Sequence, residues 1–161
     1  MVGPIQTGTS GNDHLTGTIS NDVMGAGDGH DVLRGGLGSD VLTGGAGMHI
    51  FKYIGSVDTI TDFQASDGDK LDLTSLVTIV DWNPPEREDP IPAPETLIDS
   101  YVRLIEAGGN TMVQVDVDGT SSIVVDLVEL QGVAGLSLTS MLEGGNIMNG
   151  VVTMIPKKIV A

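Results

Sequence analysis

Four aspartates stand nine residues apart near the start of the chain: Asp13, Asp22, Asp31 and Asp40. Glycines recur in the turn before each aspartate, where they allow backbone conformations closed to other residues. Such turns let main-chain carbonyl oxygens point toward a common centre, and aspartate adds a short carboxylate arm. Carboxylate and carbonyl oxygens are hard ligands that suit Ca²⁺. The residue types and their spacing therefore predict calcium binding.

The aspartates belong to five consecutive nine-residue units, which run from Gly8 to Lys52 without insertion or deletion. A large apolar residue occupies the same position in every unit: Leu15, Met24, Leu33, Leu42 and Phe51. We expect six residues of each unit to turn and three to extend. Successive strands then fall alternately on two parallel sheets, so that units n and n+2 stack about 4.8 Å apart. A flexible linker, which the composition would also allow, would not keep this phase.

Stacking of alternate units pairs Asp13 with Asp31 and Asp22 with Asp40. The third pair joins Asp31 to His49, whose imidazole nitrogen is a poor ligand for a hard cation. We therefore expect that last site to be weak, three-quarters complete or closed by something else. We also expect His49 to mark the end of the roll rather than to bind a transition metal. About two to four calcium ions are expected. The predicted ligands, side chains or main-chain carbonyls, belong to Gly8, Ser10, Gly11, Asp13, Gly17, Ile19, Ser20, Asp22, Ala26, Asp28, Gly29, Asp31, Gly35, Leu37, Gly38, Asp40, Gly44, Ala46 and Gly47.

The units resemble the RTX (repeats-in-toxin) nonapeptide repeats of proteins exported by type I secretion, with consensus Gly-Gly-x-Gly-x-Asp-x-(large apolar)-x. The match covers residues 8–52 and departs at the first glycine pair of units one to three and at the aspartate of unit five. Residues 58–76 resemble the segment that follows the repeats in the C-terminal regions of such proteins, large bacterial adhesins above all. The resemblance implies a calcium-bound parallel β-roll, export from a Gram-negative bacterium, and an uncleaved secretion signal near residues 136–161.

The composition agrees with a secreted, metal-stabilised chain. It has 161 residues, no cysteine and a net charge of −15, with seven Lys and Arg against 22 Asp and Glu. Like-charge repulsion opposes compaction until cations neutralise it. So acidic a chain excludes nucleic acid and an anionic membrane surface as partners. No apolar run approaches the roughly twenty residues needed to cross a bilayer, so membrane insertion is not expected either.

We expect an all-β protein with the roll at residues 8–54. Residues 55–161 should form a β-rich, sandwich-like cap on this roll, with at most one short helix. The clearest strand is 112–118, where valines alternate with Gln114, Asp116 and Asp118, which should face solvent. A turn at Asp118-Gly119 leads into a second strand at 122–130. A helix at 137–143 should begin at Ser137 or Thr139. Residues 98–106 fit a strand or a short helix, and 83–94 form a proline-rich loop.

Acidic residues after the repeats leave two interpretations open. Asp58, Asp62, Asp67, Asp69 and Asp72 follow the roll directly and either complete its last site or remain outside it. For Asp116 and Asp118 we favour the edge of a strand over an ion site. Neither group has the spacing of an EF-hand loop.

No catalytic motif is found, since the sequence contains neither His-Glu-x-x-His nor Gly-x-Ser-x-Gly. We expect a non-enzymatic module, at the C-terminus of a larger extracellular protein such as an adhesin, that folds on calcium after type I secretion. One alternative is a binding module that holds cell-surface components through its C-terminal region or through Trp82. Another is the accessory RTX tail of a secreted protease, lipase or polysaccharide epimerase.

Overall fold

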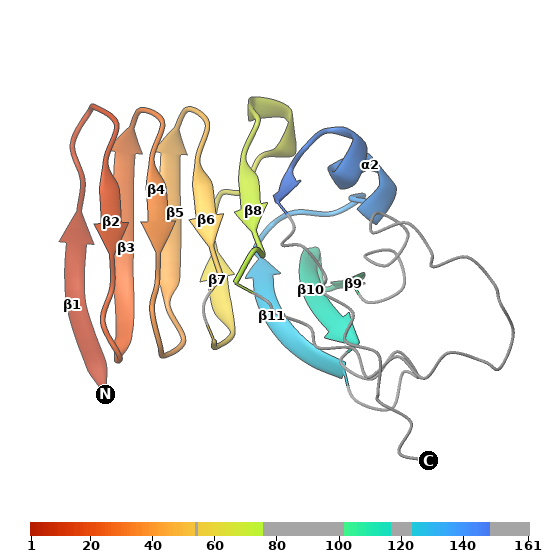
Figure 1. Cartoon of the computed structure of the whole chain (residues 1–161), viewed down its shortest axis with the longest axis horizontal. Helices are drawn as coiled ribbons and strands as arrows, with labels where there is room; N and C mark the ends of the chain where they lie inside the picture. Colours follow the sequence, from red (N-terminus) through yellow and green to blue (C-terminus); the bar gives the residue numbers. More distant parts are fainter. Residues whose placement is uncertain (54, 76–101, 117–123, 149–161) are drawn as a thin grey trace, which may run out of the picture.

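The computed structural model describes residues 1–53, 55–75, 102–116 and 124–148. Strands dominate these residues, and the first part of the chain is a parallel solenoid whose coils stack side by side (Figure 1). The predicted all-β fold with a parallel β-roll is therefore confirmed. The proline-rich stretch 83–94, Trp82, Asp118 and the end of the predicted secretion signal, 149–161, lie outside the described residues.

Each coil of the roll contributes one strand to each of two sheets. The first sheet has the strand order β1-β3-β5-β7 and the second has β2-β4-β6-β8, and all neighbours within these runs are parallel. The strands are β1 (Val2–Thr7), β2 (His14–Thr16), β3 (Asn21–Asp28), β4 (Val32–Arg34), β5 (Val41–Ala46), β6 (Ile50–Lys52), β7 (Asp58–Ile60) and β8 (Lys70–Asp72).

The register of the sheets places equivalent residues of alternate units side by side. Leu33 lies between Leu15 and Phe51 in the second sheet, and Met24 lies beside Leu42 in the first. Of these five side chains, all but the half-buried Leu15 are at most 2% exposed. The stacking of units n and n+2, with the apolar positions inside, is thereby confirmed.

Strands β3 and β5 are longer than the three residues predicted for each unit. Their extra length comes from glycine turns that also pair, with Gly27 beside Gly45. Gly45 has a φ of 104°, and a Cβ on it would lie 1.9 Å from the carbonyl oxygen of Gly27. Only glycine allows both this conformation and this approach.

The roll continues beyond His49, so the prediction that this residue marks its end is wrong. Strand β7 pairs in parallel with β5, and β8 pairs in parallel with β6. The parallel pairing therefore runs on to Asp72, beyond the predicted domain boundary at residue 54. That division into 8–54 and 55–161 stays a prediction about domains.

The residues after the roll extend both of its sheets. Strand β11 (Val124–Leu130) pairs in parallel with β7, and the antiparallel strands β10 (Asn110–Asp116) and β9 (Val102–Ala107) follow it. Strand β12 (Ile147–Met148) pairs in parallel with β8. Two layers are thus kept throughout, and Figure 1 shows the later strands curving away from the stacked coils.

The antiparallel pairing predicted for 112–118 and 122–130 is confirmed by β10 and β11, with Val113 and Val115 buried as expected. The described part of 98–106 is a strand rather than a helix. Asp116, however, does not face solvent. It is 1% exposed, and Arg103 Nη2 donates a hydrogen bond to its Oδ2 at 2.8 Å. A paired guanidinium allows a carboxylate to be buried.

The one α-helix in the described ranges is α2 (Leu138–Glu143), with Ser137 as its N-cap. Ser137 Oγ accepts a hydrogen bond from the backbone N–H of Ser140 at 3.1 Å, and Ser140 Oγ accepts one from the backbone N–H of Ser137 at 3.3 Å. Of the two caps that the sequence left open, Ser137 is the correct one. No helix in the described ranges is long and apolar enough to span a membrane.

Replacing Ser137 with alanine should lower the free energy of unfolding by about 1 kcal/mol, because a backbone N–H at the helix start loses its acceptor. Thr139→Ala is the matched control, since this exposed side chain lies inside the helix. Urea unfolding of both variants measures the difference. Equal losses in the two variants would contradict the assignment of the cap.

Candidate metal centre

Aspartates of alternate units form two columns along the roll. In each column a backbone N–H donates a hydrogen bond to the carboxylate one coil further on, from Asp13 to Asp31 Oδ1 and from Asp22 to Asp40 Oδ1, both at 2.8 Å. The second oxygen of each carboxylate is left for another partner. We call Asp13, Asp31 and His49 the first column, and Asp22, Asp40 and Asp58 the second column.

The first residue of each unit lies beside the aspartate of that unit. A Cβ on Gly17 would lie 1.9 Å from the carbonyl oxygen of Gly35 and 2.6 Å from Asp22 Oδ2. A carbonyl from the next coil and a carboxylate therefore converge on one small space, which any side chain would fill. We call this space the Gly17 cradle.

The same arrangement recurs at Gly8. A Cβ there would lie 2.2 Å from the carbonyl oxygen of Ala26 and 2.8 Å from Asp13 Oδ2. At Gly35 the nearest atom to such a Cβ is Asp40 Oδ2, at 2.2 Å. Because only hard oxygen ligands converge at the Gly8 and Gly17 cradles, their donor set fits calcium.

The second residue of each unit decides whether the aspartate Oδ2 of that unit already accepts hydrogen bonds from the protein. Asp13 Oδ2 accepts hydrogen bonds from the backbone N–H of Thr9 at 2.6 Å and from its hydroxyl at 2.8 Å. These hydrogen bonds lower the pKa of Asp13. Asp22 Oδ2 accepts from the backbone N–H of Thr18 at 2.5 Å and from its hydroxyl at 3.0 Å. Units one and two thus have their carboxylates oriented by threonine.

Units three and four have glycine in place of this threonine, at Gly27 and Gly36. Asp31 Oδ2 and Asp40 Oδ2 are buried and accept no hydrogen bond, and each residue is 1% exposed. A buried carboxylate oxygen without a partner is costly unless a cation neutralises it. Asp40 Oδ2 therefore supports a metal ion between neighbouring coils of the second column, whereas Asp31 Oδ2 has the imidazole Nδ1 of His49 at 3.3 Å.

Most of the ligands must come from the main chain. No group of three or more acidic, histidine or cysteine side chains that could hold a metal occurs in residues 1–53, 55–75, 102–116 and 124–148. The third residue of every unit is exposed, so we expect its carbonyl rather than its side chain to face an ion. These third residues are Ser10, Ile19, Asp28, Leu37 and Ala46.

Two of the predicted carbonyl ligands already have neighbours along the roll. The Ala46 carbonyl accepts a hydrogen bond from the backbone N–H of Gly29 at 2.8 Å. A Cβ on Gly47 would lie 1.9 Å from the carbonyl oxygen of Gly29. The fourth residues of the other units are Gly11, which is exposed, and Ser20 and Gly38, which are half-buried. The structure thus brings the first residue of units one, two and four close to the sixth residue of the same unit.

Asp58 extends the second column by one coil. The backbone N–H of Asp40 donates to Asp58 Oδ1 at 3.0 Å, and Asp58 is 1% exposed. Burial, with the charge of Asp40 beside it, raises the pKa of Asp58 to about 7. The signal was present in the sequence, since Asp58 and Ile60 follow Asp40 and Leu42 by two units. Counting the units only as far as Lys52 left the role of Asp58 open, because the glycine pair is absent from the sixth unit.

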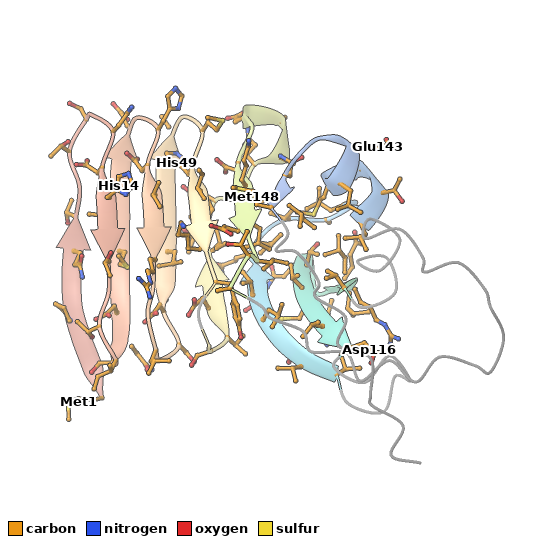
Figure 2. All side chains as sticks on the ribbon, viewed as in Figure 1. Met1, His14, His49, Asp116, Glu143 and Met148 are labelled. Atoms are coloured by element: carbon orange, nitrogen blue, oxygen red, sulfur yellow. The ribbon has the colours of Figure 1, made fainter. Side chains whose placement is uncertain are left out.

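His49 replaces an aspartate in the first column and is buried inside the roll (Figure 2). Its Nδ1 lies 3.3 Å from Asp31 Oδ2, which is an ion-pair distance without the alignment of a hydrogen bond. Its backbone N–H donates to Asp69 Oδ1 at 2.8 Å. Asp69 therefore takes the next place in this column, displaced by a two-residue insertion.

The other acidic residues after the repeats serve different partners. Asp62 accepts hydrogen bonds from the backbone N–H groups of Gly44 and Gly45 at 2.9 and 2.7 Å. Asp72 pairs with Lys52 at 3.0 Å, and Asp67 is exposed. Asp62 and Asp72 therefore link neighbouring coils, and the contacts of these three carboxylates do not extend either column.

In calcium-free solution the β-structure of the roll should be stronger at about pH 5 than at about pH 8. The pKa of Asp58 rises from 3.8 to about 7 on folding, mainly through burial. Its contribution to stability is thus complete below pH 3.8 and is lost as the pH rises through 7. Circular dichroism in EGTA across this range measures the effect, and Asp58→Asn should weaken it. A signal that strengthens as the pH rises would contradict the prediction.

Comparison with known proteins identifies the repeats. The family model for the RTX calcium-binding nonapeptide repeat (four copies) matches residues 7–42 and 25–47. No curated protein matches the chain. The solution structure of the AlgE6R3 subunit from the Azotobacter vinelandii mannuronan C5-epimerase is 21% identical, over 96% of this chain and 89% of that one, with a TM-score of 0.32. This likeness is too slight to bear on fold or function. Residues 7–47 therefore carry RTX calcium-binding nonapeptide repeats.

Proposed function

We propose that the chain is a non-catalytic, calcium-dependent folding module of a larger secreted protein. The observation that carries this proposal is the buried Asp40 Oδ2, which accepts no hydrogen bond and lies in a column that runs beside glycine cradles. A cation between the coils would satisfy it. The side chains and carbonyls that we propose as ligands belong to Gly8, Asp13, Ala26, Asp31, Gly17, Asp22, Gly35 and Asp40.

Calcium binding and folding should be one event. The cradles exist only where coils have stacked, so the unfolded chain has no preformed site. Without cations, a net charge of −15 opposes compaction. An ion present at about a hundredfold excess over its dissociation constant adds about 2.7 kcal/mol per site. Two such sites supply a large part of the 5–15 kcal/mol that is typical of whole domains.

This coupling suits export as an unfolded chain. Extracellular calcium modules bind with dissociation constants of about 10⁻⁴ to 10⁻³ M, so the chain would stay unfolded at the low calcium of the cytoplasm and fold outside the cell. The proposal includes passage through a type I apparatus, directed by a signal near residues 136–161. It also includes a final location outside the cell or on its surface.

Calorimetric titration of the 161-residue chain with calcium tests the binding step. We expect saturable binding, with dissociation constants near 10⁻⁴ to 10⁻³ M, and an equal excess of magnesium should not replace calcium. An Asp22→Asn, Asp40→Asn double variant should lose binding in the second column. A chain that takes up no calcium at millimolar concentrations would rule out the proposed function.

Export is tested separately. A passenger protein fused to residues 1–161, produced in a Gram-negative host together with a type I apparatus, should reach the medium. The same fusion without residues 136–161 should stay inside the cell. Equal secretion of both fusions would place the signal elsewhere and leave the calcium proposal untouched.

A further inference from the structure

The first column differs from the second at the first residue of unit three. This residue is Ala26, whereas the other four units have Gly8, Gly17, Gly35 and Gly44 at the same place. The side chain of Ala26 is fully buried, at 0% exposed. It therefore fills space inside the roll and not on its surface.

The repeat shows which space that methyl group fills. A Cβ at the first position of a unit points at the carboxylate of the same unit, as at Gly35, where it would lie 2.2 Å from Asp40 Oδ2. Since the strands of unit three keep the parallel register of the other units, we expect the Ala26 methyl to lie beside the Asp31 carboxylate. The methyl group of Ala26 therefore occupies the cradle between units three and five.

His49 fills the next cradle along the same column. A Cβ on Gly44 would lie 2.5 Å from Cδ2 and 2.8 Å from Cγ of the imidazole, where the second column presents carboxylate oxygen. The ring contacts Phe51 edge to face, with centroids 6.2 Å apart, and Phe51 contacts Phe63 at the same distance. Aromatic packing thus holds this part of the roll together.

We propose that Ala26 and His49 together replace the calcium ion that would bind between units three and five. The methyl removes the cradle, and the imidazole Nδ1, 3.3 Å from Asp31 Oδ2, faces the carboxylate that calcium would have faced. Calcium then binds the first column only at Gly8, while the second column keeps the open glycine positions at Gly17 and Gly35. This inference rests on the proposed function, because it concerns where calcium binds.

Restoring the consensus should restore the site. We expect the double variant A26G/H49D to bind at least one calcium ion more per chain than the wild type, measured by calorimetric stoichiometry at saturating calcium. An equal number of ions in both proteins, each folded by circular dichroism, would overturn the inference. Absence of calcium binding in the wild type would instead overturn the proposed function, so the two failures are distinguishable.

If A26G/H49D does not fold, the reciprocal variant Gly8→Ala tests whether a methyl group at the first position removes a calcium site. Gly8→Ala puts a methyl group at the first position of unit one, as Ala26 does in unit three. This methyl would lie 2.2 Å from the carbonyl oxygen of Ala26 and should remove one calcium ion. Gly25→Ala is the control, because a Cβ there meets nothing within 4 Å, and it should leave the count unchanged. A Gly8→Ala protein that binds as many ions as the wild type would show that a methyl group at the first position does not block a site.

Discussion

An Asp40→Asn variant should require at least about tenfold more calcium than the wild type to reach half of its folded signal. Asp40 is the central member of the second column, bonded to the N–H of Asp22 on one side and donating to Asp58 on the other. Loss of even an outer partner of a metal ligand usually costs about 10- to 100-fold in affinity, and here a charged ligand itself is lost. Calcium titration followed by circular dichroism measures the shift.

The same substitution should act in the opposite direction without calcium. Burial raises the pKa of Asp40, which shows that its charge is unfavourable in the folded chain when no cation is present. Asparagine removes that charge, so in EGTA the variant should be as stable as the wild type or more stable. Asp28→Asn is the matched control, because it removes the same charge from an exposed position at the end of β3. Equal effects of Asp40→Asn with and without calcium would mean that Asp40 has only a structural role.

A Gly45→Ala variant should lose about 3 kcal/mol or more of its stability in calcium. Its φ of 104° lies in a region that costs other residues about 1–3 kcal/mol. In addition, the new methyl would lie 1.9 Å from the Gly27 carbonyl oxygen, so strands β3 and β5 would have to separate. Urea unfolding at fixed, saturating calcium gives the change in free energy.

Gly25→Ala provides the comparison for this prediction. Gly25 lies in β3, close to the same turn, yet a Cβ on it meets no atom within 4 Å and its φ is not positive. The change should alter stability by less than about 1 kcal/mol. If both alanines cost the same, the close stacking of glycine turns would not be what holds the coils together.

The roll could be predicted from the sequence because one pattern decides its whole geometry. The nine-residue phase fixed the register that places Leu15, Leu33 and Phe51 in line, since each stacks on its equivalent one coil away. It also placed the aspartates in two columns. The short helix was also predicted from the sequence, although the choice between Ser137 and Thr139 as its N-cap was made only by the structure.

The predictions are wrong where the nine-residue phase of the repeat weakens. They are also wrong where a residue distant in the sequence determines the position of a side chain. Asp58 keeps the phase without the glycine pair, and Asp69 is displaced by two residues, so the roll was predicted to end too early at His49. Asp116 was placed in solvent by strand alternation, because the sequence alone does not show that Arg103 on the neighbouring strand pairs with it. Asp31 Oδ2 lacks the hydrogen bonds that Asp13 Oδ2 accepts, because unit three has Gly27 where unit one has Thr9. Only the hydrogen bonds of the structure reveal this difference.

Calcium-dependent folding is tested most directly by far-ultraviolet circular dichroism of the 161-residue chain, first in EGTA and then in millimolar calcium at neutral pH. We expect a largely unfolded spectrum in EGTA and a β-sheet spectrum in calcium, restored reversibly and not by sodium at equal ionic strength. A β-sheet spectrum of the same intensity in EGTA and in calcium would contradict the account.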